Sequence, residues 1–333
     1  MLTIEKPGLL TTVQDLGRYG YQKYGVITSG AMDPLAHRIA NILVGNKENA
    51  AALEVTLSGP VIAFNENALI SICGGDLSPA IDGKAIQLWR TTFVEKGSVL
   101  SIGSCKHGCR AYIAVAGGFS VPKIMGSTST YLRAEIGGFH GRALKRCDQL
   151  SVGSYGDLSS SMYRDLSSQA AGGSFAEMTW SIAWDVIPNN QTPAAIRVIK
   201  GREFHLFTKE SQENLFENPF EITPQSDRMG YRLKGKTLSL EQAEEMLSAA
   251  VTYGTIQVPA EGDPIVLLAD RQTTGGYPKI GQIASVDFPL IAQAKPGDKL
   301  YFTEVSHQEA QLLFLEMERK IQQLKTGIAH KFK

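Results

Sequence analysis

The chain has 333 residues, of which 43% are apolar, so it can bury a substantial interior and is long for one core; we expect two domains. Its 33 Lys and Arg residues balance 33 Asp and Glu residues, and the lack of a basic bias argues against nucleic acid or an anionic membrane as partner. Because the sequence shows neither a signal-like N-terminus nor an uncharged apolar run long enough to cross a bilayer, we expect a cytoplasmic protein.

The first distinctive stretch is Thr11 to Gly25, which contains three glycines and three tyrosines. Glycine in a helix interior costs about 1 kcal/mol relative to alanine, so this density argues against a helix. We expect a structured loop that presents Gln14, Asp15 and Arg18.

A helix is predicted directly after this loop. Asp33 is suited to the N-cap, Pro34 to the first helical position, and Gly45 to the residue that ends the helix. His37 lies inside this helix, where a surface or packing role is favoured over a catalytic one. One apolar stripe is expected, formed by Leu35, Ile39 and Leu43.

From Ala51 to Val152 the pattern changes to short β-type runs broken by glycine, which indicates a closed or sandwiched β architecture. A similar polar turn precedes a leucine-headed strand at Lys96–Leu100, Arg146–Leu150 and Pro296–Leu300. The first and third copies lie in different halves of the chain and suggest two related β-barrel domains. Cys147 stands where the other copies have glycine, so we expect strain in that turn.

Four cysteines are too few for a disulfide framework in a chain of this length, and a cytoplasmic location favours free thiols. Cys105, His107 and Cys109 have a spacing that resembles a metal cluster. No second ligand pair accompanies them, so we predict a turn between strands and no metal site.

The stretch from Gly156 to Pro193 is rich in Ser, Gly, Asn and Gln, and we interpret it as a connecting region with a boundary near Asn189 to Pro193. The predicted domains are therefore residues 1–190 and 191–333.

Beyond the boundary, capping boxes predict a helix over Ser239–Ala250 and an amphipathic C-terminal helix over Ser306–Leu324. Strands are expected over Ala195–Ile199, Val286–Leu290 and Lys299–Phe302.

The candidate site is centred on Leu267–Gly281. An apolar run, Pro264–Ala269, predicts a buried strand that ends at the polar residues Asp270–Thr274, followed by Gly275 and Gly276. A rigid strand end and a glycine loop together can admit a small polar ligand. The alternative is an Asp–Arg ion pair that closes a Gly-Gly turn.

Three other polar, glycine-bearing segments could join it: Gln14–Arg18 with Ser29–Asp33, Glu135–Arg142, and Ser226–Arg232. Arginines fit carboxylates and phosphates, and Asp15, Asp227 or Asp270 could orient them or act as a base, although a structural ion pair is the alternative for each segment. We predict catalytic roles for Asp270, Arg271, Asp227 and Arg228, and substrate contacts for Gln14, Arg18, Ser29, Asp33, Thr273, Thr274, Gly275 and Gly276. The chain lacks a phosphate-binding P-loop, a dinucleotide fingerprint, a nucleophile elbow and a zincin helix motif.

Several long motifs occur together in the order typical of one protein family, over nearly the whole chain. They are TTVQDLGRYGYQKYGVITSGAMDPLAHRIANILVGN, AALEVTLSGP, AYIAVAGGFSVP, GSTSTYLR, GREFHLF, SDRMGYRL, GTIQVPAEGDPIVLLADRQTTGGYPKIG and QAKPGDKLYF. On these residues the chain closely resembles the biotin-dependent carboxyltransferase family, also called allophanate hydrolase subunit 2.

The resemblance implies a mainly β protein with a few helices (α+β), built from two cyclophilin-like β-barrel domains. It also implies a role as one subunit of an ATP-dependent 5-oxoprolinase, a cyclic amide hydrolase that opens 5-oxo-L-proline to L-glutamate. The expected partners are the A and B subunits of that enzyme, of which the B subunit is itself similar to an inhibitor of a sporulation histidine kinase. ATP, accompanied by Mg²⁺, would be a co-substrate of the complex.

Two alternatives stay open: a regulatory protein that sequesters a histidine-kinase inhibitor, and a carboxyltransferase-like subunit that acts on another amide. The chain has no Met-Lys-Met biotinylation site and is too short for fused biotin domains, so we expect no biotin on it and disfavour a urea-carboxylase role.

Overall fold

The computed structural model describes every residue of the chain except 171, 189–193, 243, 245 and 333. Contacts divide the chain into two compact units. The first unit comprises Met1–Arg18, Asp33–Pro188 and Arg319–Lys333, and the second comprises Tyr19–Met32 and Asn189–Glu318. The predicted boundary near Asn189 to Pro193 lies outside the described residues, and the division into 1–190 and 191–333 stays a prediction.

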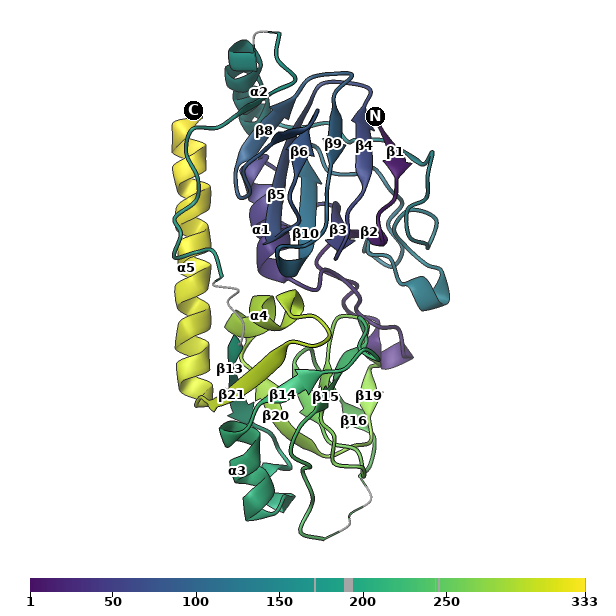
Figure 1. Cartoon of the computed structure of the whole chain (residues 1–333), viewed down its shortest axis with the longest axis vertical. Coiled ribbons are helices and arrows are strands. Elements are labelled where there is room, and N and C mark those ends of the chain that lie inside the picture. Colours follow the sequence, from purple (N-terminus) through teal and green to yellow (C-terminus); the bar gives the residue numbers. More distant parts are fainter. Residues whose placement is uncertain (171, 189–193, 243, 245, 333) are drawn as a thin grey trace. The chain divides into compact units, whose positions relative to one another are not determined.

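The first unit is built from two six-stranded sheets, with strand orders β11-β1-β4-β9-β6-β7 and β12-β8-β5-β10-β3-β2 (Figure 1). The strands are β1 (Leu2–Lys6), β2 (Leu10–Gln14), β3 (Ala52–Thr56), β4 (Val61–Phe64), β5 (Ala68–Asp76), β6 (Ala80–Ile81), β7 (Lys84–Ala85), β8 (Thr91–Val94), β9 (Val99–Ser101), β10 (His107–Val115), β11 (Gln149–Leu150) and β12 (Phe175–Glu177). Its helical elements are α1 (Pro34–Leu43), η2 (Leu132–Ala134) and α2 (Asp157–Ala170). The sandwiched β architecture predicted from the short glycine-broken runs is confirmed here.

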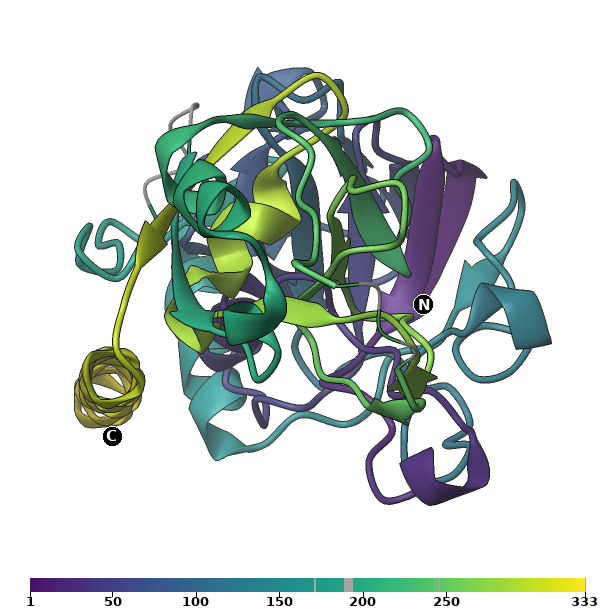
Figure 2. The same ribbon diagram turned by 90° about the horizontal axis from the view of Figure 1, so that it is seen from below.

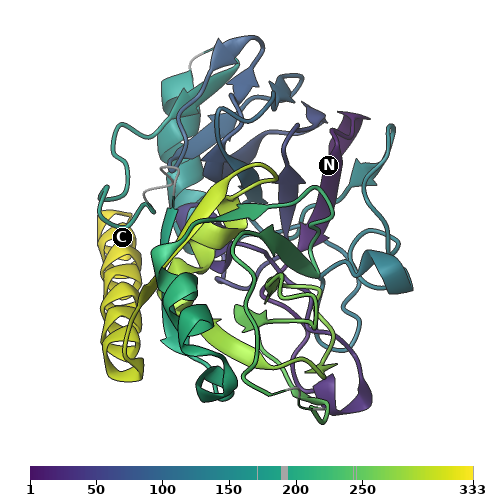
Figure 3. The ribbon, with the colours of Figure 1, turned by 60° about the horizontal axis from the view of Figure 1, so that its bottom comes forward.

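The second unit contains a closed barrel with the strand order β13-β20-β17-β18-β15-β14-β21. The strands of this unit are β13 (Ala194–Lys200), β14 (Phe220–Ile222), β15 (Gly230–Lys234), β16 (Ala249–Ala250), β17 (Thr255–Gln257), β18 (Ile265–Leu267), β19 (Thr274–Gly275), β20 (Lys279–Ile283) and β21 (Lys299–Glu304). Its helical elements are η1 (Gln22–Tyr24), η3 (Phe204–Leu206), α3 (Lys209–Glu217), η4 (Ser285–Asp287) and α4 (Phe288–Gln293), and Figure 3 shows α3 and α4 beside the barrel strands. The mainly β fold with a closed barrel is therefore confirmed.

Each unit has its own apolar core. In the first unit, Ile4, Phe64 and Leu100 are among the fully buried side chains between the sheets. The barrel core of the second unit includes Met32, which belongs to the segment Tyr19–Met32, far from the barrel strands in sequence. This segment lies beside the two-stranded β16–β19 sheet in Figures 1, 2 and 3.

The predicted helix after the glycine-rich loop is confirmed as α1. Asp33 caps it by accepting a hydrogen bond from the Ala36 N–H at 2.9 Å, Pro34 is its first residue, and Gly45 follows with a φ of 76°. The expected stripe is buried: Leu35, Ile39 and Leu43.

The C-terminal helix, α5 (His307–Lys331), is confirmed and is seen end-on as one continuous coil in Figure 2. Ser306 and Glu309 form the predicted capping box, because the Glu309 N–H donates to the Ser306 hydroxyl and Glu309 accepts from the Ser306 N–H. The predicted apolar stripe is only partly covered: Ile321 is buried, whereas Leu312 is 60% exposed. Within the described residues, no helix has the length and apolar character needed to span a membrane.

The predicted helix over Ser239–Ala250 is wrong: its described residues form no helix, and its end is strand β16. The backbone of this segment bonds to distant residues instead. The Ser239 N–H donates to the Ser211 hydroxyl, and the Glu241 N–H donates to the Leu206 carbonyl. These long-range bonds replace the i→i+4 bonds that the capping-box pattern led us to expect.

The strand predicted over Val286–Leu290 is also wrong, since η4 and α4 occupy it. Pro289 lies in the first turn of α4, a position where its missing N–H costs nothing. Strands at β13 and β21 are confirmed, and β18 is a shorter form of the predicted run Pro264–Ala269.

The region interpreted as a connection, Gly156 to Pro193, contains α2 and the paired strand β12. Its many serines obscure an apolar helical stripe, of which Met162 and Leu166 are fully buried. The predicted loop over Thr11–Gly25 likewise begins as strand β2 and includes η1.

Candidate functional site

The central feature of the second unit is a buried ion pair between Arg228 and Asp270. Arg228 Nε and Nη2 donate to the two Asp270 carboxylate oxygens at 2.8 and 3.1 Å, and both side chains are 8% exposed. The Asp270 N–H donates to the Arg228 carbonyl, which holds the two loops together. A bidentate pair of this kind satisfies both charges. Asp270 therefore takes part in an ion pair, as the alternative to a ligand site supposed, but its partner is Arg228 and not the adjacent Arg271.

This ion pair also holds the segment that contains Ser29. Arg228 Nη2 donates to the Gly30 carbonyl at 2.6 Å, and the Tyr253 hydroxyl donates to the Met32 carbonyl at 2.8 Å. Ser29, Arg228 and Asp270, which come from three of the predicted segments, are therefore brought into one network of the second unit.

Ser29 itself has an unusual backbone and an unused hydroxyl. Its φ of 53° lies in the left-handed region, it is 5% exposed, and its Oγ has no hydrogen-bond partner among the described residues. Left-handed backbone at a non-glycine residue, and a buried hydroxyl without a partner, both cost free energy.

Arg271 and Asp227 lie at the edges of this network. Arg271 is partly buried, and its Nε and Nη1 donate to the carbonyls of Val251 and Leu268 at 3.4 and 3.2 Å. Asp227 is exposed and accepts a hydrogen bond from the Met229 N–H at 2.7 Å, so it shapes the turn that leads to Arg228.

The residues that follow Arg271 form a hairpin edge. Thr274 and Gly275 make up strand β19, which pairs with β16, and the Thr273 carbonyl accepts from the Val251 N–H. A Cβ on Gly275 would lie 2.3 Å from the Gln257 side chain. Glycine at this position therefore admits a neighbouring side chain of the protein.

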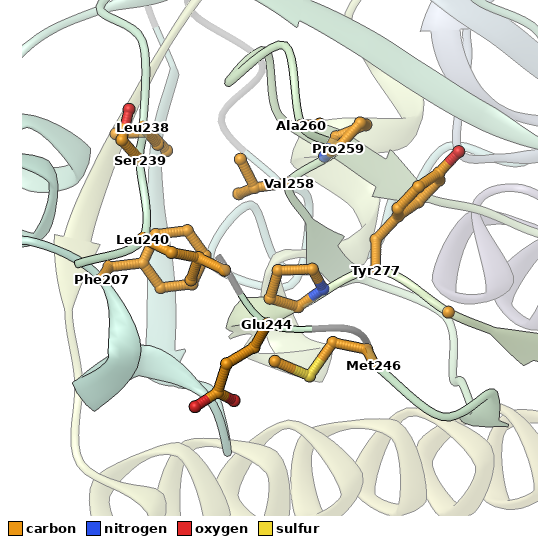
Figure 4. Close-up of a pocket in the computed structure, with 12 residues that line it drawn as sticks. Phe207, Leu238, Ser239, Leu240, Glu244, Met246, Val258, Pro259, Ala260 and Tyr277 are labelled. Carbon is orange, nitrogen blue, oxygen red and sulfur yellow. The ribbon is translucent and has the colours of Figure 1, made fainter. Parts of the chain in front are cut away.

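A cavity of about 570 Å³ lies next to this hairpin, and Figure 4 shows its lining. Of the predicted site residues only Gly276 borders it. Apolar side chains, among them Phe207, Leu240, Val258 and Met246, contribute to its wall, while the Glu244 carboxylate points away from them.

In the first unit, Asp15 is held in a cradle of hydroxyls. It is 1% exposed and accepts hydrogen bonds from the Ser127, Thr128 and Ser129 hydroxyls and from the Thr128 and Gly17 N–H groups. Burial raises the pKa of Asp15, but these hydrogen bonds outweigh it and bring the pKa below the ordinary 3.8.

Gln14 and Arg18 are buried rather than presented to solvent. Gln14 Nε2 donates to the Thr130 carbonyl, and Arg18 donates to the Ile124 and Ser129 carbonyls. Gly137 of the segment Glu135–Arg142 packs against Arg18, because a Cβ there would lie 2.8 Å from Nη2. These contacts bring two predicted segments together as structural support in the first unit.

Asp33, besides capping α1, donates its N–H to the Tyr112 hydroxyl at 2.7 Å, and that hydroxyl donates to Glu54 at 2.6 Å. His37 is fully buried, and its Nε2 lies 3.2 Å from the Gln14 carbonyl. Burial lowers the pKa of His37, so the ring is neutral near pH 7.

The reasoning from sequence missed Tyr112, Glu54, Tyr253 and the hydroxyl run Ser127–Thr130. Only the last carried a usable signal, since four consecutive hydroxyl residues are suited to surround a carboxylate. The predicted metal-free turn at Cys105 contains the start of β10, and no group of three His, Cys, Asp or Glu in the described ranges could hold a metal ion.

The sequence of the chain matches a model of a known protein family. The model described as carboxyltransferase domain, subdomain A and B, matches residues 24–304. The chain belongs to this carboxyltransferase domain family.

Individual proteins also match along most of the chain. The C subunit of the 5-oxoprolinase of Escherichia coli (strain K12) is 38% identical over 325 residues, 97% of this chain and 97% of that protein. The C subunit of the 5-oxoprolinase of Haemophilus influenzae is 37% identical over 320 residues, 96% of each chain. Among solved structures, the K. lactis urea amidolyase matches with a TM-score of 0.86 and 28% identity; the match covers 97% of this chain and 20% of that one, so this chain spans about a fifth of that protein.

Proposed function

We propose that this chain is the C subunit of an ATP-dependent 5-oxoprolinase, which hydrolyses 5-oxo-L-proline to L-glutamate. The observation that carries the proposal is the 38% identity to the C subunit of a 5-oxoprolinase over 97% of both chains. The match therefore covers nearly the whole length of the named subunit and is not confined to one of its parts.

The chemistry of this reaction explains why ATP is needed. A lactam carbonyl is a poor electrophile, and phosphorylation of its oxygen by ATP releases ADP and gives water a carbon that it can attack. The ring C–N bond then breaks, the nitrogen takes up a proton as the amine of glutamate, and water releases the phosphate. Stabilising the phosphoryl transfer requires cations and fixed N–H donors, and Mg²⁺ would arrive with the nucleotide.

The catalytic work would be shared within a complex of three kinds of chain. We assign this chain to a complex with a B subunit, which would share the ATP-dependent activation, and with an A subunit, which would open the ring. Arg228 is already paired with Asp270, so Arg271 is the arginine of these two loops that suits an oxyanion, which arginine recognises through paired donors.

The direct test is release of glutamate and ADP from 5-oxo-L-proline and ATP, measured with the purified chain together with candidate A and B subunits and again without this chain. We expect coupled release only in the complete mixture. Equal release of glutamate and ADP without this chain would refute the proposal.

A second candidate, a role in the turnover of another amide, is favoured by the similarity to urea amidolyase. The same mixture, assayed for ADP release with a panel of lactams and linear amides, separates this candidate from the first. A stable complex with the B subunit and no turnover of any amide would instead support a regulatory role in sequestering a kinase inhibitor.

A further inference from the structure

Arg271 forms no ion pair with a carboxylate in the described part of the chain. Its neighbour in sequence, Asp270, accepts hydrogen bonds from Nε and Nη2 of Arg228. The bonds of Arg271 go instead to two backbone carbonyls, those of Val251 and Leu268, through Nε and Nη1. Nη2 has no acceptor among the described residues, so part of the guanidinium is available to a ligand.

The surroundings of Arg271 make this unpaired charge unfavourable in the absence of an anion. Burial lowers the pKa of Arg271, while Tyr19, Tyr253 and Asp270 raise it. A partly buried guanidinium is normally paired with a carboxylate or phosphate, because taking the charge out of water is costly. The adjacent carboxylate of Asp270 is already hydrogen-bonded to Arg228. A counter-ion for Arg271 would therefore have to come from a ligand.

The Ser29 segment supplies a second unused group in the same unit. The Ser29 hydroxyl is buried and has no partner in the described part of the chain. Its backbone is left-handed, and the carbonyl of the next residue, Gly30, accepts a hydrogen bond from Arg228. Tyr253, which is among the groups that raise the pKa of Arg271, also donates to the Met32 carbonyl of this segment. Strain combined with an unused hydrogen-bonding group is characteristic of ligand sites.

We propose that Arg271 and the Ser29 hydroxyl form an oxyanion subsite of the second unit that binds the carboxylate of the substrate. The identity of the substrate rests on the proposed function: 5-oxo-L-proline bears a single formal charge, its carboxylate, and a planar two-oxygen anion matches the planar donor fork of arginine. In this arrangement Arg228 and Asp270 are positioning residues, which neutralise each other and hold the Ser29–Gly30 segment in place. A phosphate group of ATP presents similar oxygens and is the other source of such an anion.

The test compares two lactams in the complete complex: 5-oxo-L-proline and 2-pyrrolidinone, which has the same ring without the carboxylate. The variants are Arg271→Gln and Ser29→Ala, with Arg202→Gln as a matched control, because Arg202 belongs to the same unit and its side chain is 87% exposed. For each protein, kcat/KM for both lactams, KM for ATP and the melting temperature are measured.

We expect Arg271→Gln to lower kcat/KM for 5-oxo-L-proline roughly 10- to 100-fold and Ser29→Ala roughly 3- to 10-fold, the losses that follow removal of a charged and a neutral hydrogen bond. In the same variants, kcat/KM for 2-pyrrolidinone should stay within about 2-fold of the wild-type value, so the ratio of the two kcat/KM values falls. Arg271→Lys should restore this ratio only in part. The Arg202→Gln control should leave both values unchanged.

An equal loss for both lactams in Arg271→Gln would overturn the subsite and reduce Arg271 to a structural residue. A raised KM for ATP with unchanged discrimination would overturn it in favour of a phosphate contact. If the wild-type complex turns over neither lactam, the proposed function fails; the subsite is then judged by ligand-observed NMR of both lactams with the wild-type complex, where equal binding of the two, or none, refutes it.

Discussion

Cys147 adopts a backbone that glycine occupies in two similar turns. Its φ is 68°, compared with 89° at both Gly97 and Gly297, and all three residues lie in turns that lead into a strand. A left-handed conformation costs a residue with a Cβ about 1–2 kcal/mol. Glycine avoids this cost, but its greater conformational freedom in the unfolded chain offsets part of the advantage. The strain expected at this turn is therefore present.

We predict that Cys147→Gly raises the free energy of unfolding by about 0.5–1 kcal/mol, since Cys147 is exposed and its N–H bond to the Ile4 carbonyl is kept. Urea denaturation measures the change. The reverse substitution, Gly97→Ala, is the control: a Cβ there meets nothing within 4 Å, so only the conformational cost remains and stability should fall by a similar amount. Destabilisation by Cys147→Gly would show that the thiol makes a favourable contribution of its own.

Asp15 is a buried carboxylate surrounded by hydrogen-bond donors, and its removal should be costly. Asn at this position cannot accept all of these hydrogen bonds, so we predict that Asp15→Asn lowers the free energy of unfolding by about 1–3 kcal/mol near neutral pH.

The pH dependence of this loss has a defined sign. Because the folded-state pKa of Asp15 lies below the ordinary 3.8, its contribution is complete above that value and disappears as the pH falls through the folded pKa. The difference between wild type and Asp15→Asn should therefore narrow below about pH 3.8, as measured by urea denaturation at several pH values. Glu5→Gln, on an exposed residue of β1, is the control, and a difference that widens in acid would contradict the assignment.

At the scale of elements, α1 depends on a single capping side chain that was also predicted to contact substrate. Asp33→Ala removes the acceptor for the Ala36 N–H and should cost about 1 kcal/mol of stability, whereas Asp33→Asn, which can still cap, should cost much less. Thermal melts of both variants measure this. Equal losses in the two would mean that the negative charge of Asp33, rather than its cap, is what stabilises the first unit.

The strand pairing of the second unit shows why some elements could be predicted and others could not. The capping boxes at Ser239 and Ser306 look alike in sequence, yet only the second begins a helix. In the first, the Glu241 N–H reaches the Leu206 carbonyl, and the Thr208 N–H reaches the Ser239 carbonyl. Backbone pairing across a distance in sequence therefore overrode a local signal.

At the scale of the whole molecule, the second unit draws on a short N-terminal segment that the division at residue 190 would remove. Met32 is fully buried in the barrel core, and the carbonyls of Gly30 and Met32 accept hydrogen bonds from Arg228 and Tyr253. Burial of one such side chain contributes about 1.5–3 kcal/mol, a large part of the stability of a small domain.

We therefore predict that a fragment of residues 191–333 melts less cooperatively and is cleaved faster by protease than the same fragment with residues 19–32 joined to it through a flexible linker. Thermal melting and limited proteolysis of the two fragments provide the measurement. Equal behaviour would show that the barrel does not need this segment.

The sequence by itself determined the features that depend on neighbours only a few residues apart. The cap at Asp33, the box at Ser306 and Glu309, and the left-handed turn at Cys147 each involve bonds or backbone angles within one turn of chain. The long motifs also indicated the family, which the comparisons confirm.

Only the tertiary structure decided how the polar site residues are used. Asp270 pairs with Arg228, 42 residues away, rather than with the adjacent Arg271, and Asp15 is bound by hydroxyls more than 110 residues away. The reason is physical: a buried charge is stabilised by whichever donors the packed backbones bring within about 3 Å, and spacing along the chain carries no information about those distances. The same packing gives Arg271 two backbone carbonyls as acceptors and, among the described residues, no ion pair with a carboxylate.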